Sequence, residues 1–337
     1  PVIVDFPLPS KVVLCGEAFP LQVRDVYERL DMEFTIAVHS RSQVFLWMRR
    51  AGRYFPHIEK RLKAAGLPDD LKYLAVAESD LRSHVTSPAQ ARGTWQFIAS
   101  TGQRHGLVKN KNFDERLNFE LSTEAAISYL VQLKAMFGTW TLAMAAYNCG
   151  EGCVAQAIKE QEINDYFRLD LPYETERYVY RIAAIKMILE NPQRYGYTFP
   201  PERTYKPMPQ EMVSVNLSGE VHLTRVAKAI GTDYKVLKEL NPQILGTHLP
   251  EGTYSLAVPA GLGAKTTAFL NELKKPAAGV AGGPPAPKTE AKYYVVKPGD
   301  TLTQISMRTG VPVEALCRLN NIQGSNIWSG QRLKLAD

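Results

Sequence analysis

The sequence predicts a mainly α-helical domain followed by two small modules, each built from two helices and two strands. Between residues 21 and 195, apolar side chains recur at helical spacing, with breaks at glycine and proline. Closely spaced prolines then interrupt residues 197–210, where neither a helix nor a central strand would tolerate them. Beyond that point the chain repeats itself, because Gly231 and Leu237 align with Gly310 and Leu316 without a gap.

The helical part is expected to span residues 21–200. Residues 1–20 contain prolines and little periodicity, so we expect an extended arm lying on the surface of the following domain. Helices are expected over residues 24–35, over 43–66 with breaks at Gly52, Pro56 and Gly66, and over 68–78, 94–105, 122–137, 140–147, 154–159 and 174–189.

Each repeat is expected to read strand, helix, helix, strand over about 45 residues. The two modules are placed at 212–260 and 291–337. A linker is expected over 263–290, because its Pro, Ala and Gly residues favour a semi-extended, flexible chain.

Composition and charge exclude several classes of protein. The formal charge is +6, but the basic residues are scattered, and no basic block interleaved with aromatics suggests nucleic-acid binding. No apolar run approaches the roughly 20 residues that span a bilayer. The chain starts at Pro1 without a leader, so a targeting peptide or lipid anchor would lie outside it.

The four cysteines match neither a dense disulfide framework nor a zinc site, and we expect no metal and no cofactor. Cys149 and Cys153 are interpreted mainly as small buried hydrophobes. A local bridge between them in an oxidising compartment is the alternative.

Glu78 is the first candidate catalytic residue. It ends the apolar run 73–77, and burial of a carboxylate raises its pKa. A glutamate in that environment can serve as a general acid near neutral pH. The alternative is a glutamate at a helix end that faces water.

Residues 291–335 resemble a LysM module. The resemblance rests on Val296, the run Pro298–Leu302, Leu319-Asn320 and Gly330-Gln331. It implies binding of glycans that contain N-acetylglucosamine. The residues expected to contact the glycan are Gly299, Asp300, Thr301, Leu302, Asn326 and Ile327.

Residues 212–259 resemble a degenerate LysM module. Glu220, Val221 and His222 stand at the positions of Gly299, Asp300 and Thr301. This module is therefore expected to be structural or to bind glycan weakly.

The helical part resembles the lysozyme-like domain of family 1 lytic transglycosylases of the membrane-bound murein transglycosylase D type. Three motifs carry the resemblance: Glu78-Ser79; Ser87-Pro88 with Gly93-x-Trp95-Gln96-Phe97; and Ala145-Ala146-Tyr147-Asn148-x-Gly150-Glu151-Gly152. The sequence departs from the family pattern at Arg82-Ser83, Gln90, Ala99, Cys149 and Cys153, and none of these departures removes a catalytic group.

The resemblance implies a reaction with one carboxylate. Most glycosidases use two, yet Asp80 would point away from Glu78 on a helix. In the family, the acid protonates the oxygen between N-acetylmuramic acid and N-acetylglucosamine. As a base it then takes the proton of the muramoyl C6 hydroxyl, which closes a 1,6-anhydro ring without water.

The resemblance also assigns substrate-binding residues: Ser79, Ser87, Gln96, Tyr147, Asn148 and Tyr178. Tyr178 is expected to orient Glu78, and its alternative is a place in the core. Asn148 has the alternative of a helix C-cap. Ser79 and Ser87 are expected to support the loop or the substrate.

We therefore expect a peptidoglycan lytic transglycosylase, a monomer in the periplasm or cell envelope of a Gram-negative bacterium. Its partner would be peptidoglycan glycan strands, with membrane association only through an N-terminal anchor. Two alternatives remain: a muramidase hydrolase of the goose-type lysozyme kind, and a non-catalytic scaffold that binds peptidoglycan through 291–335.

Overall fold

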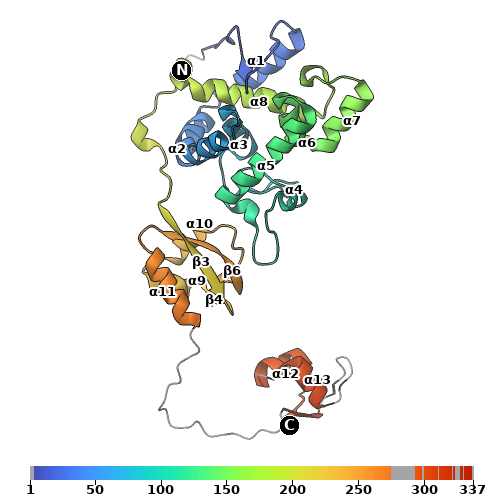
Figure 1. Cartoon of the computed structure of the whole chain (residues 1–337), viewed down its shortest axis with the longest axis vertical. Helices are drawn as coiled ribbons and strands as arrows, with labels where there is room; N and C mark the ends of the chain where they lie inside the picture. The colour runs from blue at the N-terminus through green and yellow to red at the C-terminus, as the bar shows by residue number, and fades with distance from the viewer. Residues whose placement is uncertain are drawn as a thin grey trace. The chain divides into compact units, whose positions relative to one another are not determined.

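The computed structural model describes residues 4–274, 293–297, 300–309, 311–320, 322, 327–328 and 330–335. The chain divides into two compact units, Pro1–Pro276 and Ala277–Asp337. The first unit contains the helical domain and the first repeat module, and the second contains the other module (Figure 1).

The helical domain is organised around α8 (Tyr173–Glu190), which packs against α1, α2, α3 and α6 (Figure 1). The other helices are α1 (Arg24–His39), α2 (Arg41–Ala64), α3 (Lys72–Ser79), α4 (Ala99–Arg104), α5 (Phe119–Phe137), α6 (Trp140–Cys149) and α7 (Glu151–Gln161). Short 3-10 turns cover Asp69–Leu71, Glu115–Leu117, Tyr166–Arg168, Pro192–Tyr195 and Pro201–Arg203. The predicted fold class, mainly α with two small modules, is confirmed, and the first module has a third helix and a second pair of strands beyond the predicted two helices and two strands.

Burial of α3 positions the candidate catalytic residue. Leu74, Ala75 and Val76 are completely buried in the core of the helical domain. Tyr178 and Val179 on α8 belong to the same core, and α3 packs directly on α8. The end of α3 is therefore fixed against α8 by apolar contacts on most of its surface.

The N-terminal segment corrects the expectation of a surface arm. β1 (Val13–Leu14) and β2 (Glu17–Ala18) pair antiparallel, with Val13 opposite Ala18. Val12, Leu14 and Phe19 are buried in the core of the helical domain. The Glu17 carboxylate accepts backbone N–H groups of Trp140 and Thr141 in the first turn of α6. Residues 12–19 are thus built into the helical domain.

The first repeat module is a two-stranded sheet covered by three helices. β3 (Gln210–Leu217) pairs antiparallel with β6 (Gly252–Pro259). β4 (Val221–His222) and β5 (His248–Leu249) form a second, short pair. The helices are α9 (Leu223–Ile230), α10 (Tyr234–Leu240) and α11 (Gly263–Lys274).

Helix α11 corrects the predicted start of the linker. The sequence predicts a linker over 263–290, but residues 263–274 form α11, which packs against β3 and α9. Leu270 is buried, and the Glu211 carboxylate accepts the N–H groups of Gly261 and Gly263 at the start of the helix. The Pro-rich composition that suggested a linker begins only at Pro276. The rest of the expected linker lies outside the described residues.

The second module contains β7 (Tyr293–Val295), α12 (Leu302–Thr309), α13 (Val313–Leu319) and β8 (Arg332–Lys334). β7 and β8 pair antiparallel. Its core includes Val296, Leu302, Ile305, Leu316 and Leu333.

An asparagine makes the same bonds in both modules. The Asn241 amide donates to Leu237 and Ala257 carbonyls and accepts the Ala257 N–H. Asn320, at the aligned position, donates to the Leu316 and Lys334 carbonyls and accepts the Lys334 N–H. Each asparagine thus ties the end of the second helix to the last strand.

The first module is joined to the helical domain by backbone hydrogen bonds. Asp114 donates its N–H to the Gln243 carbonyl at 2.9 Å, and Leu245 donates to the Asn112 carbonyl at 2.9 Å. Between them Phe113 and Ile244 form an antiparallel bridge. The module thus pairs with residues 112–114, which belong to the irregular segment before α5. Among the described residues, no helix is long and apolar enough to cross a bilayer.

Candidate active site

Glu78 lies in the last turn of α3, and the next residues bend sharply. Asp80 ends the helix in the left-handed region, with a φ of 56°, and its N–H returns to the Val76 carbonyl. Two residues of α2 fix Asp80: the Trp47 indole donates to its carboxylate at 2.8 Å, and Arg50 donates to its carbonyl at 3.1 Å. Asp80 is therefore engaged with α2.

Tyr178 of α8 meets Glu78 of α3. The phenol hydroxyl donates a hydrogen bond to the Glu78 Oε1 atom. Burial raises the pKa of Glu78 from 4.5 to about 7, although the bond from Tyr178 and the positive charge of Arg181 lower it. Both protonation states of this carboxyl are thus populated near neutral pH.

Tyr147 of α6 lies close enough to the same carboxyl to feel its charge. Burial, and then the charge of Glu78, raise the pKa of the Tyr147 hydroxyl well above its ordinary value, so it stays protonated. The hydroxyl donates to the Trp95 carbonyl at 2.8 Å. Asn148, the next residue, accepts a hydrogen bond at 2.8 Å from the Thr175 hydroxyl at the start of α8.

The loop 82–98 contains the remaining predicted residues. The Gln96 amide donates to the Gly93 carbonyl at 2.8 Å and to the Val85 carbonyl at 3.2 Å. The Ser87 hydroxyl accepts the Ala91 N–H at 3.1 Å. These bonds use the amide nitrogen of Gln96 to hold the loop and leave its carbonyl oxygen without a partner in residues 4–274.

Ser79 has a supporting position. Its side chain is 2% exposed, and its hydroxyl donates to the Thr94 carbonyl at 2.7 Å. A buried hydroxyl with such a bond ties the end of α3 to the loop and is not available to a ligand.

Gly93 is required by the close approach of another chain segment. Its φ is +80°, and a Cβ atom at this position would lie 1.9 Å from the Arg116 carbonyl oxygen. Only glycine fits both restrictions.

The loop is held by a buried ion cluster that the sequence did not predict. Arg116 donates to both carboxylate oxygens of Asp114, at 2.8 and 2.7 Å, and to the Gln90 and Phe97 carbonyls, at 2.9 and 3.0 Å. Arg92 donates to the same carboxylate at 3.1 Å. Burial would raise the pKa of Asp114, but the two arginines outweigh it and lower that pKa.

Strained backbone concentrates in this region. Among the described residues, six side-chain-bearing residues have a positive φ, and four of them lie here: Asp80, Leu81, Gln90 and Gln96. Such conformations cost about 1–3 kcal/mol each and are typical of functional sites.

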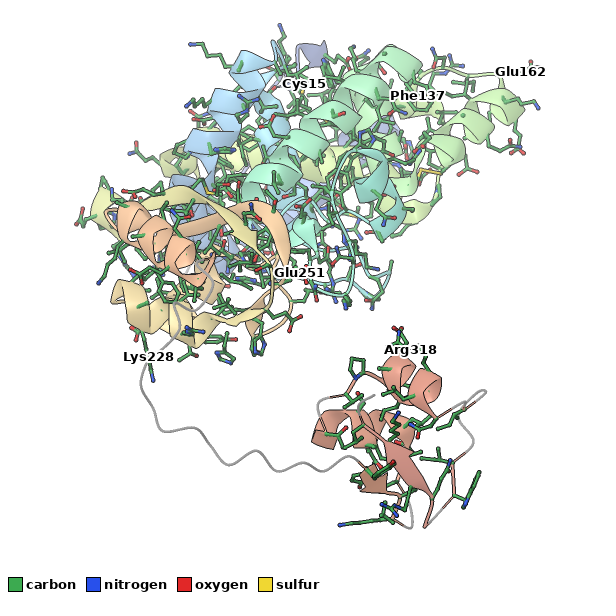
Figure 2. The ribbon with its side chains drawn as sticks, turned by 60° about the horizontal axis from the view of Figure 1, so that its bottom comes forward. Cys15, Phe137, Glu162, Lys228, Glu251 and Arg318 are labelled. Atoms are coloured by element: carbon green, nitrogen blue, oxygen red, sulfur yellow. A yellow bond between two sulfur atoms is a disulfide. The ribbon has the colours of Figure 1, made fainter. Side chains whose placement is uncertain are left out.

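A disulfide corrects the reading of two cysteines. The sequence favours two small buried hydrophobes at Cys149 and Cys153, but the two residues are bonded to each other, with Cα atoms 5.9 Å apart (Figure 2). They lie in different helices, because Gly150 ends α6 with a φ of 91° and α7 begins at Glu151. The disulfide joins the end of α6 to the first turn of α7, directly after Asn148.

The predicted glycan-binding residues of the second module differ in their exposure and in their hydrogen bonds. Asp300 accepts the Lys297 N–H at 2.9 Å and the Tyr294 hydroxyl at 2.7 Å, and Thr301 accepts the Gln304 N–H. Leu302 is 4% exposed, so its side chain belongs to the core and only its backbone can meet a glycan.

Ile327 packs against the core of this module. Gly299 and Asn326 lie outside the described residues. Among the described residues, no group of three His, Cys, Asp or Glu side chains could hold a metal ion.

The domains match known families. Residues 56–168 match the transglycosylase SLT domain, residues 211–275 match the LysM-like domain of lytic transglycosylase MltD, and residues 294–336 match the LysM domain. The chain therefore contains an SLT domain followed by two LysM-type domains.

A curated relative is similar to most of this chain. The membrane-bound lytic murein transglycosylase D of Escherichia coli strain K12 is 34% identical over 295 residues, which cover 85% of this chain. The match covers 64% of that relative's length.

Two solved structures are also similar. The lytic transglycosylase Slt of Pseudomonas aeruginosa matches 45% of this chain and 26% of its own, with 20% identity and a TM-score of 0.34. The 70 kDa soluble lytic transglycosylase of Escherichia coli matches 49% of this chain and 30% of its own, with 22% identity and a TM-score of 0.35.

Proposed function

We propose that this protein is a peptidoglycan lytic transglycosylase with Glu78 as its catalytic acid and base. One observation carries the proposal: a half-buried carboxyl with a pKa near 7, oriented by the Tyr178 hydroxyl, inside a matched SLT domain. A group with this pKa can both give and take a proton at neutral pH.

The reaction follows from a single carboxyl. Protonated Glu78 donates its proton to the glycosidic oxygen between N-acetylmuramic acid and N-acetylglucosamine, and that C–O bond breaks. The resulting carboxylate accepts the proton of the muramoyl C6 hydroxyl, whose oxygen bonds to C1. The product is a 1,6-anhydro sugar, Glu78 is protonated again, and no water is consumed.

The neighbouring side chains have distinct proposed roles. Tyr178 holds the Glu78 carboxyl in one orientation and lowers its pKa toward neutrality. Tyr147 and Asn148 line the sugar cleft beside it, and Gln96 offers its free carbonyl oxygen. Ser79 and Ser87 support the loop, as their internal bonds favour.

The LysM module at 294–336 is proposed to hold the enzyme on peptidoglycan strands. The Cys149–Cys153 bridge favours an oxidising compartment, which agrees with a Gram-negative periplasm. Anchoring to the outer membrane and a monomeric state complete the proposal.

Mass spectrometry of digested peptidoglycan tests the reaction. Wild-type protein should release muropeptides with anhydro ends, and Glu78→Gln should release none. Reducing muropeptides heavier by one water would instead support the muramidase alternative. Release by neither protein would leave only a scaffold, and equal release by both would show that Glu78 is not the catalytic residue.

A further inference from the structure

A large cavity lies between the helical domain and the first module, apart from Glu78. Its volume is about 680 Å³. Side chains reach it from α2, from the bend after α3, from the start of α5, from the connection 205–210 and from the end of α10. Glu78, Tyr147 and Tyr178 do not line it. The reaction proposed above therefore leaves this cavity unused.

Two arginines of α2 give the cavity unpaired positive charge. Arg50 and Arg53 are three positions apart, so they lie on the same face of the helix. Arg50 uses one N–H on the Asp80 carbonyl, and Arg53 uses one on the Lys206 carbonyl, at 3.0 Å. Within residues 4–274, neither guanidinium is paired with a carboxylate. Guanidinium groups with free N–H groups bind carboxylates in a fork.

Apolar surface accompanies this charge. Tyr54 and Phe119 meet edge to face, with ring centroids 4.7 Å apart, and Met208 and Leu240 contribute from the other side of the junction. The acids in the lining, Glu120 and Glu239, lie on other elements, and Glu120 already accepts the Gln210 amide at 3.0 Å. The cavity suits a ligand with carboxylates and short apolar groups.

The cavity is close to the scissile bond. Leu81 lines it and follows Glu78 by three residues, so their Cα atoms are at most about 11 Å apart. A four-residue peptide spans up to about 13 Å when extended. Peptidoglycan carries such peptides on N-acetylmuramic acid, and they contain free carboxylates and alanine methyl groups.

We propose that this cavity is a binding site for the carboxylate-bearing peptides of peptidoglycan. The inference rests on the proposed function for its substrate polymer. It assigns a role to the first module as well, because α10 forms one wall of the site. The enzyme would thus bind the peptides of its substrate at the junction of the helical domain and the first module.

Binding is tested with the full chain and a free tetrapeptide, L-Ala-γ-D-Glu-meso-diaminopimelyl-D-Ala, by calorimetry. Arg53→Gln should weaken binding at least tenfold, because the fork to a carboxylate is lost. Lys60→Gln is the matched control, since Lys60 is exposed on the same helix and does not line the cavity. Met208→Trp should also weaken binding, by filling the space. Amidation of the peptide carboxylates should have the effect of Arg53→Gln.

Turnover gives a second readout. The ratio of kcat/KM for peptide-bearing strands to that for strands stripped of peptides should fall about tenfold in Arg53→Gln, through KM. Equal binding by wild type and Arg53→Gln, or equal binding of the amidated peptide, overturns the site. A peptide that binds as expected while no strand yields anhydro products would instead defeat the proposed reaction and leave the site standing.

Discussion

The Tyr178 hydroxyl donates its hydrogen bond to Glu78 across 100 positions of sequence. The two residues lie on α8 and α3, helices that pack through completely buried apolar side chains. The bond therefore fixes the carboxyl relative to the core of the domain and not only to its own loop. It also opposes the effect of burial on the pKa of Glu78.

Tyr178→Phe should change the pH profile as well as the rate. Without the hydroxyl, the pKa of Glu78 rises further, so the fall of kcat at alkaline pH should move to higher pH. We expect kcat to drop roughly tenfold, as the loss of one orienting hydrogen bond implies. Kinetics between pH 5 and 9 provide the measurement.

Tyr180→Phe is the control for that experiment. Tyr180 lies on the same helix and is equally buried, and in residues 4–274 its hydroxyl makes no hydrogen bond. An unchanged profile in Tyr178→Phe would contradict the role of its hydroxyl.

Glu78→Gln should stabilise the protein above pH 7. The folded protein binds a proton at Glu78 with a pKa of about 7, and the unfolded chain with a pKa of 4.5. Between these values the folded state holds more protons, so the stability of the wild type falls as pH rises. The gain in the variant should be absent below pH 4.5 and reach roughly 3 kcal/mol above pH 7.

Urea unfolding of both proteins from pH 4 to 8 measures this gain. A difference in stability that stays constant with pH would rule out a raised pKa at Glu78.

Asp114→Asn should loosen the loop 82–98. The substitution leaves Arg116 buried without its carboxylate, which costs about 3–5 kcal/mol. Since Arg116 also holds the Gln90 and Phe97 carbonyls, activity should fall together with stability. Hydrogen exchange of the loop amides should show the loss locally.

Glu202→Gln, at an exposed position, is the control for the charge change. Normal protection of the loop in Asp114→Asn would show that the cluster does not hold it.

The double variant Cys149→Ala/Cys153→Ala should be less stable by about 2 kcal/mol, the amount that loop-closure entropy predicts for so short a loop. Thermal unfolding with and without dithiothreitol measures the change. The reductant should destabilise the wild type to the level of the variant and leave the variant unaffected. A wild type that is insensitive to the reductant would argue against a stabilising bridge.

Removal of residues 291–337 should weaken binding to insoluble cell wall and leave cleavage of soluble fragments largely intact. These residues belong to the second compact unit, so the first should fold without them. Sedimentation with purified cell wall compares the two proteins, and equal amounts in the pellet would refute an anchoring role.

The sequence allowed the prediction of the fold class and of a raised pKa at Glu78, because periodicity and motifs are local signals. The sequence did not allow the prediction of the Asp114–Arg116 cluster, since an ion pair becomes buried only through tertiary packing. Helix α11 was missed because its start is next to a Pro-rich stretch and its amphipathic pattern is short. The disulfide was underrated because spacing alone did not reveal that Gly150 breaks the helix between the two cysteines.

The bond from Asp114 to Gln243 has a practical meaning for anyone who wishes to isolate the smallest active piece of this protein. Asp114 is also the anchor of the arginines that hold the loop beside Glu78. A fragment that stops at Tyr197 exposes that anchor to water and removes its neighbour. The natural place to end such a fragment is after Lys274, where α11 finishes.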